Sequence, residues 1–350
     1  MEYRLEEIFD LQMGKTPSRS NPDYWNTCEN KWISIADLSK CGKYIENTKE
    51  YLSDQAVEES GINQIPENTV IMSFKLSIGK TAITSEPMYS NEAIMSFRDK
   101  KMVDILPDYI FYMFLSRNWD EGTNKAVMGK TLNKATLSKI KITLPDIKMQ
   151  KMVVDILDKV SDIIANRKVE LEKLDNLIKA RFIEMFYDKG YPVLKWDDVF
   201  NTTTGKLDSN AAVDSGQYPF FTCSKEVLRI DKYAFEQEAL LLAGNNAAGK
   251  YDVKYYNGKF NAYQRTYVLG LKEDWSYRLF QYQLEDKLVY LQQQSLGGLT
   301  KYLTLKILGE LEFVIPPKDK QEEFELFVAQ VDKSKLHNKS HKRYGYERTI

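Results

Sequence analysis

The chain has 350 residues, which is long enough for two ordinary domains that each bury a core of their own. Apolar residues make up 43% and aromatic residues 12%, a composition that belongs to folded proteins and excludes a disordered chain. The formal net charge is −1 at pH 7, so the chain as a whole does not attract nucleic acid. Any such binding has to come from local patches.

Residue types that carry catalysis or bind metals are scarce. The only two histidines, His337 and His341, lie in the polar C-terminal tail, which argues against imidazole triads and zinc sites. The three cysteines (Cys28, Cys41 and Cys223) form no CxxC pair, and no apolar run is long enough to cross a membrane. The N-terminus is acidic and lacks a signal-peptide pattern. We therefore expect a reduced cytoplasmic protein that is not itself an enzyme and needs no metal or cofactor.

The first part of the chain alternates short apolar runs with polar turns. Strands are predicted at Lys31–Leu38, Asn68–Phe74 and Glu92–Phe97, because these runs are short and rich in β-branched and aromatic residues. A helix is predicted at Pro107–Arg117, opened by its proline. The pattern predicts a mixed α+β domain.

Residues 148–186 contain neither proline nor glycine and predict one long helix. Apolar residues recur on one face at heptad spacing, and Arg167 and Arg181 occupy the two remaining positions of that face. These apolar residues are Val153, Leu157, Val160, Ile164, Leu171, Leu174, Ile178 and Met185. The pattern is typical of a coiled coil, and such a helix would extend roughly 55–60 Å. The alternative is a single amphipathic helix packed on a core.

The second half repeats this layout. Strands are predicted at Glu238–Gly244 and Arg265–Leu271, and one helix at Trp275–Gln292. A second long helix begins after Pro317 and repeats the first three apolar positions of the earlier one. These are Phe324, Val328 and Val331.

The second long helix is expected to be shorter than the first. Lys335, Asn338 and Lys342 interrupt its apolar face, and the basic, polar tail that follows is expected to fray. Burying these cations would be costly without counter-charges. If the two long helices pair with each other, roughly the distal half of the first helix would therefore lack a partner and expose Leu171, Leu174 and Ile178. Such an exposed apolar stripe favours self-association of the chain through the first long helix, or a looser complex with a protein partner.

The chain is an internal duplication. Three blocks align without gaps: Leu5–Lys15 with Trp196–Lys206, Thr69–Lys80 with Ala239–Lys250, and Thr143–Leu157 with Val314–Val328. In the register of the second block, Asn91 aligns with Asn261. The repeat is about half the chain, far longer than a solenoid repeat. We divide the chain into a first domain at residues 1–147, the long helix at 148–189, a second domain at 190–316, and the shortened helix with its tail at 317–350.

Each copy has a glycine–lysine turn at a strand end, Gly79–Lys80 and Gly249–Lys250. Both turns come close to a phosphate-binding loop, but the first lacks the leading glycine, because Phe74 takes its place. The second has Tyr251 where a serine or threonine would bind magnesium. Nucleotide binding is therefore not predicted. The turns fit loops laid against a phosphate backbone, and solvated turns are the alternative.

Cations gather around these turns. Thr123–Lys141 carries five lysines and no acid, and Lys250–Arg265 mixes four cations with several aromatic residues, a pattern typical of nucleic-acid contact. A solvated surface is the alternative for each run. The candidate DNA-binding residues are Lys15, Lys75, Lys80, Lys130, Lys134, Lys206, Asn245, Lys250, Lys254, Arg265 and Lys301.

The order of these motifs resembles the specificity subunit of type I restriction–modification systems. The resemblance rests on Gly14–Trp25, Ile65–Ile83, the Asn91 block and Leu144–Phe186, and on the same order recurring from Trp196 to about Val331. It implies two similar α+β target-recognition domains, each reading one half of a bipartite double-stranded DNA site. It also implies that the two long helices pair as an antiparallel coiled coil and recruit two methyltransferase subunits, and that a motor/endonuclease subunit joins for cleavage. This chain departs from the family pattern in its second long helix, which is shorter.

Two other classes of protein remain as alternatives. A catalytic DNA methyltransferase or nuclease would need a cofactor loop and a catalytic domain, for which the chain has neither motif nor room. A coiled-coil scaffold that binds only proteins would explain the long helix without any DNA readout.

Overall fold

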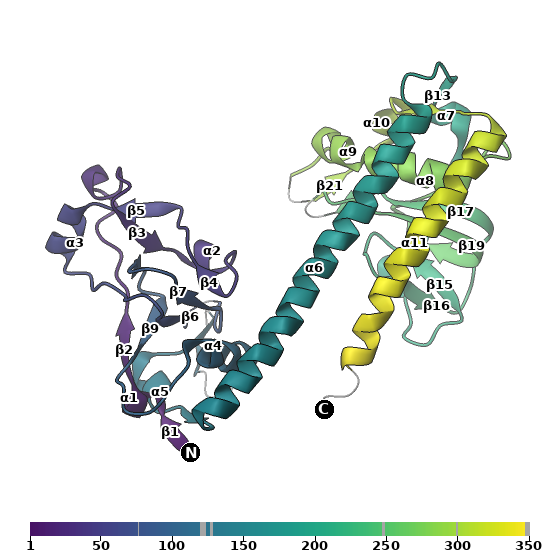
Figure 1. Cartoon of the computed structure of the whole chain (residues 1–350). Coiled ribbons are helices and arrows are strands. Elements are labelled where there is room, and N and C mark those ends of the chain that lie inside the picture. Colours follow the sequence, from purple (N-terminus) through teal and green to yellow (C-terminus); the bar gives the residue numbers. More distant parts are fainter. Residues whose placement is uncertain (76, 120–123, 127–128, 247–248, 299, 347–350) are drawn as a thin grey trace. The chain divides into compact units, whose positions relative to one another are not determined.

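The computed structural model (Figure 1) describes residues 1–75, 77–119, 124–126, 129–246, 249–298 and 300–346, of which 124–126, 129–131 and 336–346 are described by their backbone alone. The chain forms two compact units, Met1–Ala165 and Asn166–Ile350. Each unit is a mixed α+β domain, as the sequence predicts. The finer domain boundaries proposed above stay a prediction, because helix α6 (Ile147–Phe186) contributes to both units.

The first unit is built around a five-stranded sheet. Its strands, in spatial order, are β2 (Phe9–Met13), β9 (Ile94–Asp99), β6 (Val70–Ser73), β7 (Thr81–Thr84) and β4 (Tyr44–Ile45). The core between this sheet and α4 (Pro107–Ser116) includes Met72, Phe97 and Phe114, all buried. A short pair, β1 (Glu2–Arg4) with β12 (Lys141–Thr143), joins the two ends of the domain and leads the chain into α6. The remaining short elements are α1 (Leu5–Ile8), β10 (Asn124–Ala126), β11 (Gly129–Thr131) and α5 (Lys134–Ser138).

A small lobe with its own core extends the first unit. It contains η1 (Pro22–Tyr24), α2 (Ile35–Leu38), α3 (Asp54–Ser60) and the sheet of β5 (Glu50–Leu52), β3 (Asn30–Ile33) and β8 (Tyr89–Ser90). The strand predicted at Lys31–Leu38 is wrong in its second half, because the chain turns into α2 after Ile33. Ser34 and Asp37 form a capping box there, in which the Ser34 N–H donates to the Asp37 carboxylate at 3.0 Å.

The second unit repeats the frame with a six-stranded sheet. Its spatial order is β14 (Phe200–Thr204), β20 (Thr266–Leu271), β17 (Phe235–Ala243), β19 (Val253–Ala262), β15 (Tyr218–Phe221) and β16 (Leu228–Ile230). The helix predicted at Trp275–Gln292 is broken at Lys287 into α8 (Tyr277–Asp286) and α9 (Leu288–Gln294). Shorter elements complete the unit: β13 (Val193–Lys195), α7 (Trp196–Val199), η2 (Ser209–Ala211), β18 (Asn245–Asn246), β21 (Lys301–Tyr302), α10 (Leu305–Gly309) and β22 (Glu312–Val314).

The duplication is confirmed by hydrogen bonds, but its register differs from the sequence alignment. The Phe74 N–H donates to the Ala93 carbonyl at 3.0 Å, and the Gly244 N–H donates to the Arg265 carbonyl at 2.8 Å. The first residues of these pairs differ by 170 positions and the second by 172, since 244 − 74 = 170 and 265 − 93 = 172. The loop after β17 therefore has two extra residues compared with the loop after β6.

Two sequence equivalences are wrong for this reason. The Asn91 N–H donates to Ile33 as the Tyr263 N–H donates to Phe221, so the counterpart of Asn91 is Tyr263 rather than Asn261. The Ser73 N–H likewise donates to the Lys80 carbonyl as the Ala243 N–H donates to that of Asp252. Lys80 and Lys250 are therefore not equivalent positions.

The first half of α6 packs against its own domain. Val154 is buried, and Val153 and Leu157 face Tyr109 and Met113 of α4 across a shallow groove. These two residues were predicted to belong to a coiled-coil seam, and the structure places them against α4 instead. Farther along the same face, Val160 and Ile164 are exposed.

The distal half of α6 pairs with α11 (Lys318–Tyr346) in an antiparallel arrangement (Figure 1). Arg181 forms an ion pair with Glu323 at 2.6 Å, and Asp175 forms one with Lys335 at 2.7 Å, so positions that ascend on α6 descend on α11. Around these two ion pairs, the apolar cluster contains Leu174, Ile178, Phe182, Phe324, Val328 and Val331. The antiparallel coiled coil is therefore confirmed for this part of the chain.

The expected exposure of the distal seam is wrong. Ile178 is only 6% exposed, Leu171 and Leu174 are half-buried, and α11 runs to Tyr346 although its apolar pattern stops earlier. Lys335 is accommodated because Asp175 and Asp332 supply the counter-charges. The side chains of Asn338 and Lys342 lie outside the described residues. The argument for self-association through this stripe no longer holds.

One buried glutamine ties each long helix to its domain. The Leu106 N–H donates to Gln150 Oε1 at 3.0 Å, and Gln150 Nε2 donates to the carbonyls of Asp104 and Pro145. In the second copy the Ser276 N–H donates to Gln321 Oε1 at 2.9 Å, and Gln321 Nε2 donates to Pro316. Leu106 and Ser276 are the N-caps of α4 and α8, so both copies use the same joint.

Replacing the glutamine of the first copy should destabilise the first unit strongly. Gln150 is fully buried, and Gln150→Ala leaves one N–H and two carbonyls without their partner, which should cost about 2–4 kcal/mol. Denaturant unfolding combined with hydrogen exchange of α4 amides measures this. Gln55→Ala, which removes an exposed hydrogen bond to Glu59, should cost less than about 0.5 kcal/mol. Equal losses in the two variants would contradict the role given to Gln150.

Candidate nucleic-acid interface

In the first unit, four segments meet at one end of the main sheet. The Gly14 N–H donates to Ile94 at 3.2 Å, and the Lys15 N–H donates to Ser90 at 2.8 Å, which joins the end of β2 to the residues before and at the start of β9. The Leu132 N–H donates to Phe74 at 3.1 Å, which adds the segment before α5. The loops that carry most of the first unit's predicted cations therefore converge at this end.

The second unit gathers the same segments at the same end of its sheet. The Leu303 N–H donates to Gly244 at 2.8 Å, the Gln264 N–H donates to Leu207 at 2.9 Å, and β18 pairs with β21. These bonds place Lys206, Asn245, Arg265 and Lys301 around one loop cluster. Lys250 follows the turn at Gly249, whose Cβ position would lie 3.4 Å from Lys301 Cγ.

Glycine is required directly after β2 and after β14, the corresponding strands of the two copies. A Cβ at Gly14 would lie 2.1 Å from the Ser90 carbonyl oxygen, and one at Gly205 would lie 1.8 Å from that of Ala262. Only a residue without a side chain allows two backbones to approach this closely. The glycines thus fix where Lys15 and Lys206, the next residues along the chain, leave the sheet.

Most of the cations predicted in the second unit are at least partly exposed to solvent. Lys206, Lys250 and Arg265 are exposed, and Lys301 and Asn245 are half-buried. Lys254 differs, because its ammonium is bound by Asp252 and donates to the Ser224 carbonyl at 2.9 Å. The other three lysines and Arg265 thus stay at least partly exposed around this loop cluster.

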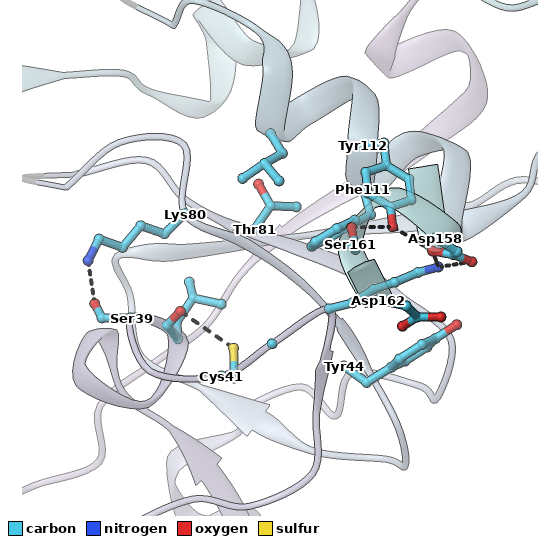
Figure 2. Close-up of a pocket in the computed structure, with 14 residues that line it drawn as sticks. Ser39, Cys41, Tyr44, Lys80, Thr81, Phe111, Tyr112, Asp158, Ser161 and Asp162 are labelled. Atoms are coloured by element: carbon cyan, nitrogen blue, oxygen red, sulfur yellow. Dashed lines mark hydrogen bonds and ion pairs between the residues drawn. The ribbon is translucent and has the colours of Figure 1, made fainter. Parts of the chain in front are cut away.

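The cations of the first unit are more engaged. Lys15 donates to the Ser60 carbonyl, and Lys80 donates to Ser39 Oγ at 2.7 Å on the wall of a cavity of about 670 Å³ (Figure 2). Lys75 lies near Glu92, whose pKa is lowered chiefly by the hydrogen bond from Thr16 and also by the charge of Lys75. 

One further predicted lysine of the first unit does not join this loop cluster, because Lys134 begins α5 and lies beside Glu6 and Asp10 in a separate shallow cleft. Lys130 lies in β11, and its side chain is outside the described residues.

Arg19 is a structural residue that the sequence patterns did not single out. Its guanidinium lies 3.6 Å from the ring centre of Trp25 and 4.9 Å from that of Trp32, and it pairs with Glu50. It therefore joins the chain that follows Lys15 to the small lobe. The signal was an arginine six residues before a tryptophan, which becomes meaningful only once Trp32 is known to be adjacent.

Among the described residues, no three histidine, cysteine, aspartate or glutamate side chains are grouped to hold a metal ion. The described helices include none with the length and apolar character needed to cross a membrane.

The sequence matches the family described as the type I restriction modification DNA specificity domain, over residues 1–175 and again over 188–343. The chain therefore belongs to this family of specificity subunits. Both matches agree with the internal duplication seen in the fold.

Individual relatives match parts or most of the chain. The EcoDI specificity subunit of Escherichia coli is 37% identical over 145 residues, which are 39% of this chain and 31% of that subunit. The EcoprrI specificity subunit of Escherichia coli is 22% identical over 346 residues, 91% of this chain and 84% of the relative. The S subunit of a type I system from M. genitalium has the same fold, with a TM-score of 0.58, 13% identity, and coverage of 97% of this chain and 91% of that one.

The glycine beside Lys206 should be irreplaceable. Gly205→Ala would force its Cβ against the Ala262 backbone and should destabilise the second unit by about 2 kcal/mol or more. Gly270→Ala is the matched control, because its Cβ would meet nothing within 4 Å. Thermal unfolding followed by circular dichroism compares the two. Similar melting temperatures would show that the close approach at Gly205 carries no energetic constraint.

Proposed function

We propose that the chain reads a bipartite double-stranded DNA site as the non-catalytic specificity subunit of a type I restriction–modification complex. The observation that carries this proposal is the pairing of one common sheet frame with two different loop clusters. Phosphates are alike at any sequence, so shared loop ends suit backbone contacts, whereas loops that differ suit base readout. Two such readers can recognise two different half-sites.

The long helix supports the bipartite reading. α6 extends over 40 residues, about 60 Å at ~1.5 Å per residue, and it belongs to both units. A defined distance between two readers fixes the number of unread base pairs between half-sites, as in dimeric DNA-binding proteins.

The proposed protein partners are two methyltransferase subunits and a motor/endonuclease subunit. Met152, Ile156 and Ile163 are exposed on α6, and apolar side chains that gather on a surface mark interaction sites. The pairing of α6 with α11 leaves these residues uncovered in the described chain. A scaffold that binds proteins alone would use the same surface, and DNA binding distinguishes the two functions.

Exchanging one domain should change one half-site. We expect that replacing residues 190–316 with the matching segment of the EcoprrI subunit alters the bases read in one half of the methylated motif and leaves the other half intact. The reason is that each sheet carries its own loop cluster. Sequencing of methylated DNA from cells that carry the chimera and its methyltransferase measures the outcome. A motif altered in both halves would contradict independent reading.

Removing one cation from the second loop cluster should weaken DNA binding and its salt dependence. Arg265 precedes β20 at the loop end, and Lys272 follows the same strand at the other end. Arg265→Ala should reduce the slope of log K against log salt by about 0.9 for one phosphate contact, and Lys272→Ala should leave it unchanged. Titration of labelled duplex DNA at several salt concentrations measures both slopes. If the complex containing the wild-type chain binds no DNA, the alternative function, a scaffold that binds proteins alone, would be favoured.

A further inference from the structure

A charged cluster joins three elements where α6 crosses the first domain. Lys43, which precedes β4, pairs with Asp158 of α6 at 2.7 Å and also with Asp108 of α4. Tyr44 donates to Asp108 at 2.7 Å, and Tyr112 of α4 donates to Asp158. Figure 2 shows Tyr112 and Ser161 beside Asp158 at one side of the cavity. A single lysine thus connects α6 to the sheet and to α4 at once.

The cluster is partly withdrawn from water. The Lys43 side chain is 17% exposed and that of Asp158 is 41% exposed. Burial opposes both charges, but the hydrogen bonds and charges within the cluster outweigh it, raising the pKa of Lys43 and lowering that of Asp158. Lys43 and Asp158 are therefore charged at neutral pH and act as a pair.

Asp158 is the second fixed point of α6 on this domain. The first is Gln150, which ties the foot of the helix to the N-cap of α4. Asp158 follows eight residues later (158 − 150), about 12 Å along the helix at ~1.5 Å per residue. Val153 and Leu157 contact α4 between these two points, so Asp158 holds α6 near the outer end of its contact with the domain, where it limits tilting most.

The second copy holds its long helix differently. Arg278 lies two residues after the N-cap of α8, as Asp108 lies two residues after the N-cap of α4, and it pairs directly with Asp332 of α11 at 3.4 Å. The charge at this position is therefore reversed between the copies. Lys43 lies in the stretch of chain between β3 and β5. The corresponding stretch of the second copy, between β15 and β16, is shorter. The three-way cluster is a device of the first domain and not of the shared frame.

We propose that Lys43, with Asp108 and Asp158, is a positioning clamp that fixes the direction of α6 as it leaves the first domain. This inference rests on the proposed function: the clamp sets how strictly the complex selects the number of base pairs between the two half-sites. The 28 positions from Asp158 to Phe186 (186 − 158) extend about 42 Å. A tilt of about 10° at the clamp would move the far end by ~7 Å, about two base-pair steps of ~3.4 Å.

Methylation of DNAs with altered spacers tests the clamp in the assembled complex. The substrates carry the preferred spacer or one that is a single base pair longer or shorter. Lys43→Met should raise methylation of the altered sites relative to the preferred one by about five-fold, with both half-site sequences unchanged. Asp158→Asn should act in the same direction and keeps the shape of the side chain. An unchanged spacer profile in both variants would overturn the proposal.

Two further variants separate positioning from mere stability. Lys43→Arg keeps a cation that reaches both carboxylates and should retain the wild-type spacer profile. Lys31→Met removes a comparable pair with Glu86 in the same domain, away from α6, and should also retain it. Relaxed spacing in Lys31→Met would overturn the proposal, because loss of any ion pair would then suffice.

A distance measurement on the full chain tests the clamp without DNA. Spin labels at Lys49→Cys in the first domain and Lys173→Cys on α6 are introduced in a chain whose native cysteines (Cys28, Cys41 and Cys223) are serines. Lys43→Met should broaden the distance distribution, and Lys43→Arg should keep it narrow. Equal widths in the two variants would overturn the clamp. A complex that recognises no bipartite site would overturn the proposed function. The distances between the spin labels would then still show whether Lys43 fixes the direction of α6.

Discussion

The structure depends on how a long helix is anchored to a compact domain. A helix end that is buried beside another helix end leaves backbone N–H and carbonyl groups without partners, and each such group must be satisfied. A glutamine side chain carries both an acceptor and donors, so Gln150 and Gln321 each satisfy an N-cap N–H and one or more carbonyls at the same joint. Because both copies retain this joint, the two domains can diverge at their loop ends while each helix still starts from the same place.

Beyond the glutamine, the two units stabilise their helices by different forces. In the second unit, α6 and α11 share an aromatic cluster in which the ring centres of Phe182, Phe186 and Phe324 lie 5.1–5.8 Å apart. In the first unit, α6 meets α4 through half-buried apolar residues and the Lys43 cluster. Ion pairs that are partly exposed are weakened by salt, whereas apolar packing is not. The first joint should therefore depend more on ionic conditions than the second, where ion pairs such as Arg181–Glu323 only flank an aromatic cluster.

The sequence predicts the features that depend on periodicity and on repeated order. The duplication, the α+β class and α6 follow from apolar spacing and from the absence of proline and glycine over residues 148–186. It could not predict contacts between distant residues, such as Asp175 neutralising Lys335. The false equivalence of Lys80 and Lys250 has the same origin, because a loop with two extra residues can repeat the letters Gly-Lys while shifting the backbone pairing.

The same limit explains how far the candidate interface could be predicted. Lys206 and Arg265 are recognisable because they adjoin strand ends, and a strand end places a side chain at the edge of a sheet. Whether a lysine stays available depends on its neighbours: Lys80 is bound to Ser39, and Lys134 lies beside Glu6 and Asp10. Gly14 and Gly205 keep the backbone of the two loop ends alike through a close approach that admits no side chain. The two units therefore share the backbone at these loop ends and differ in the side chains and segments around them, an arrangement that would suit the proposed reading of two different half-sites.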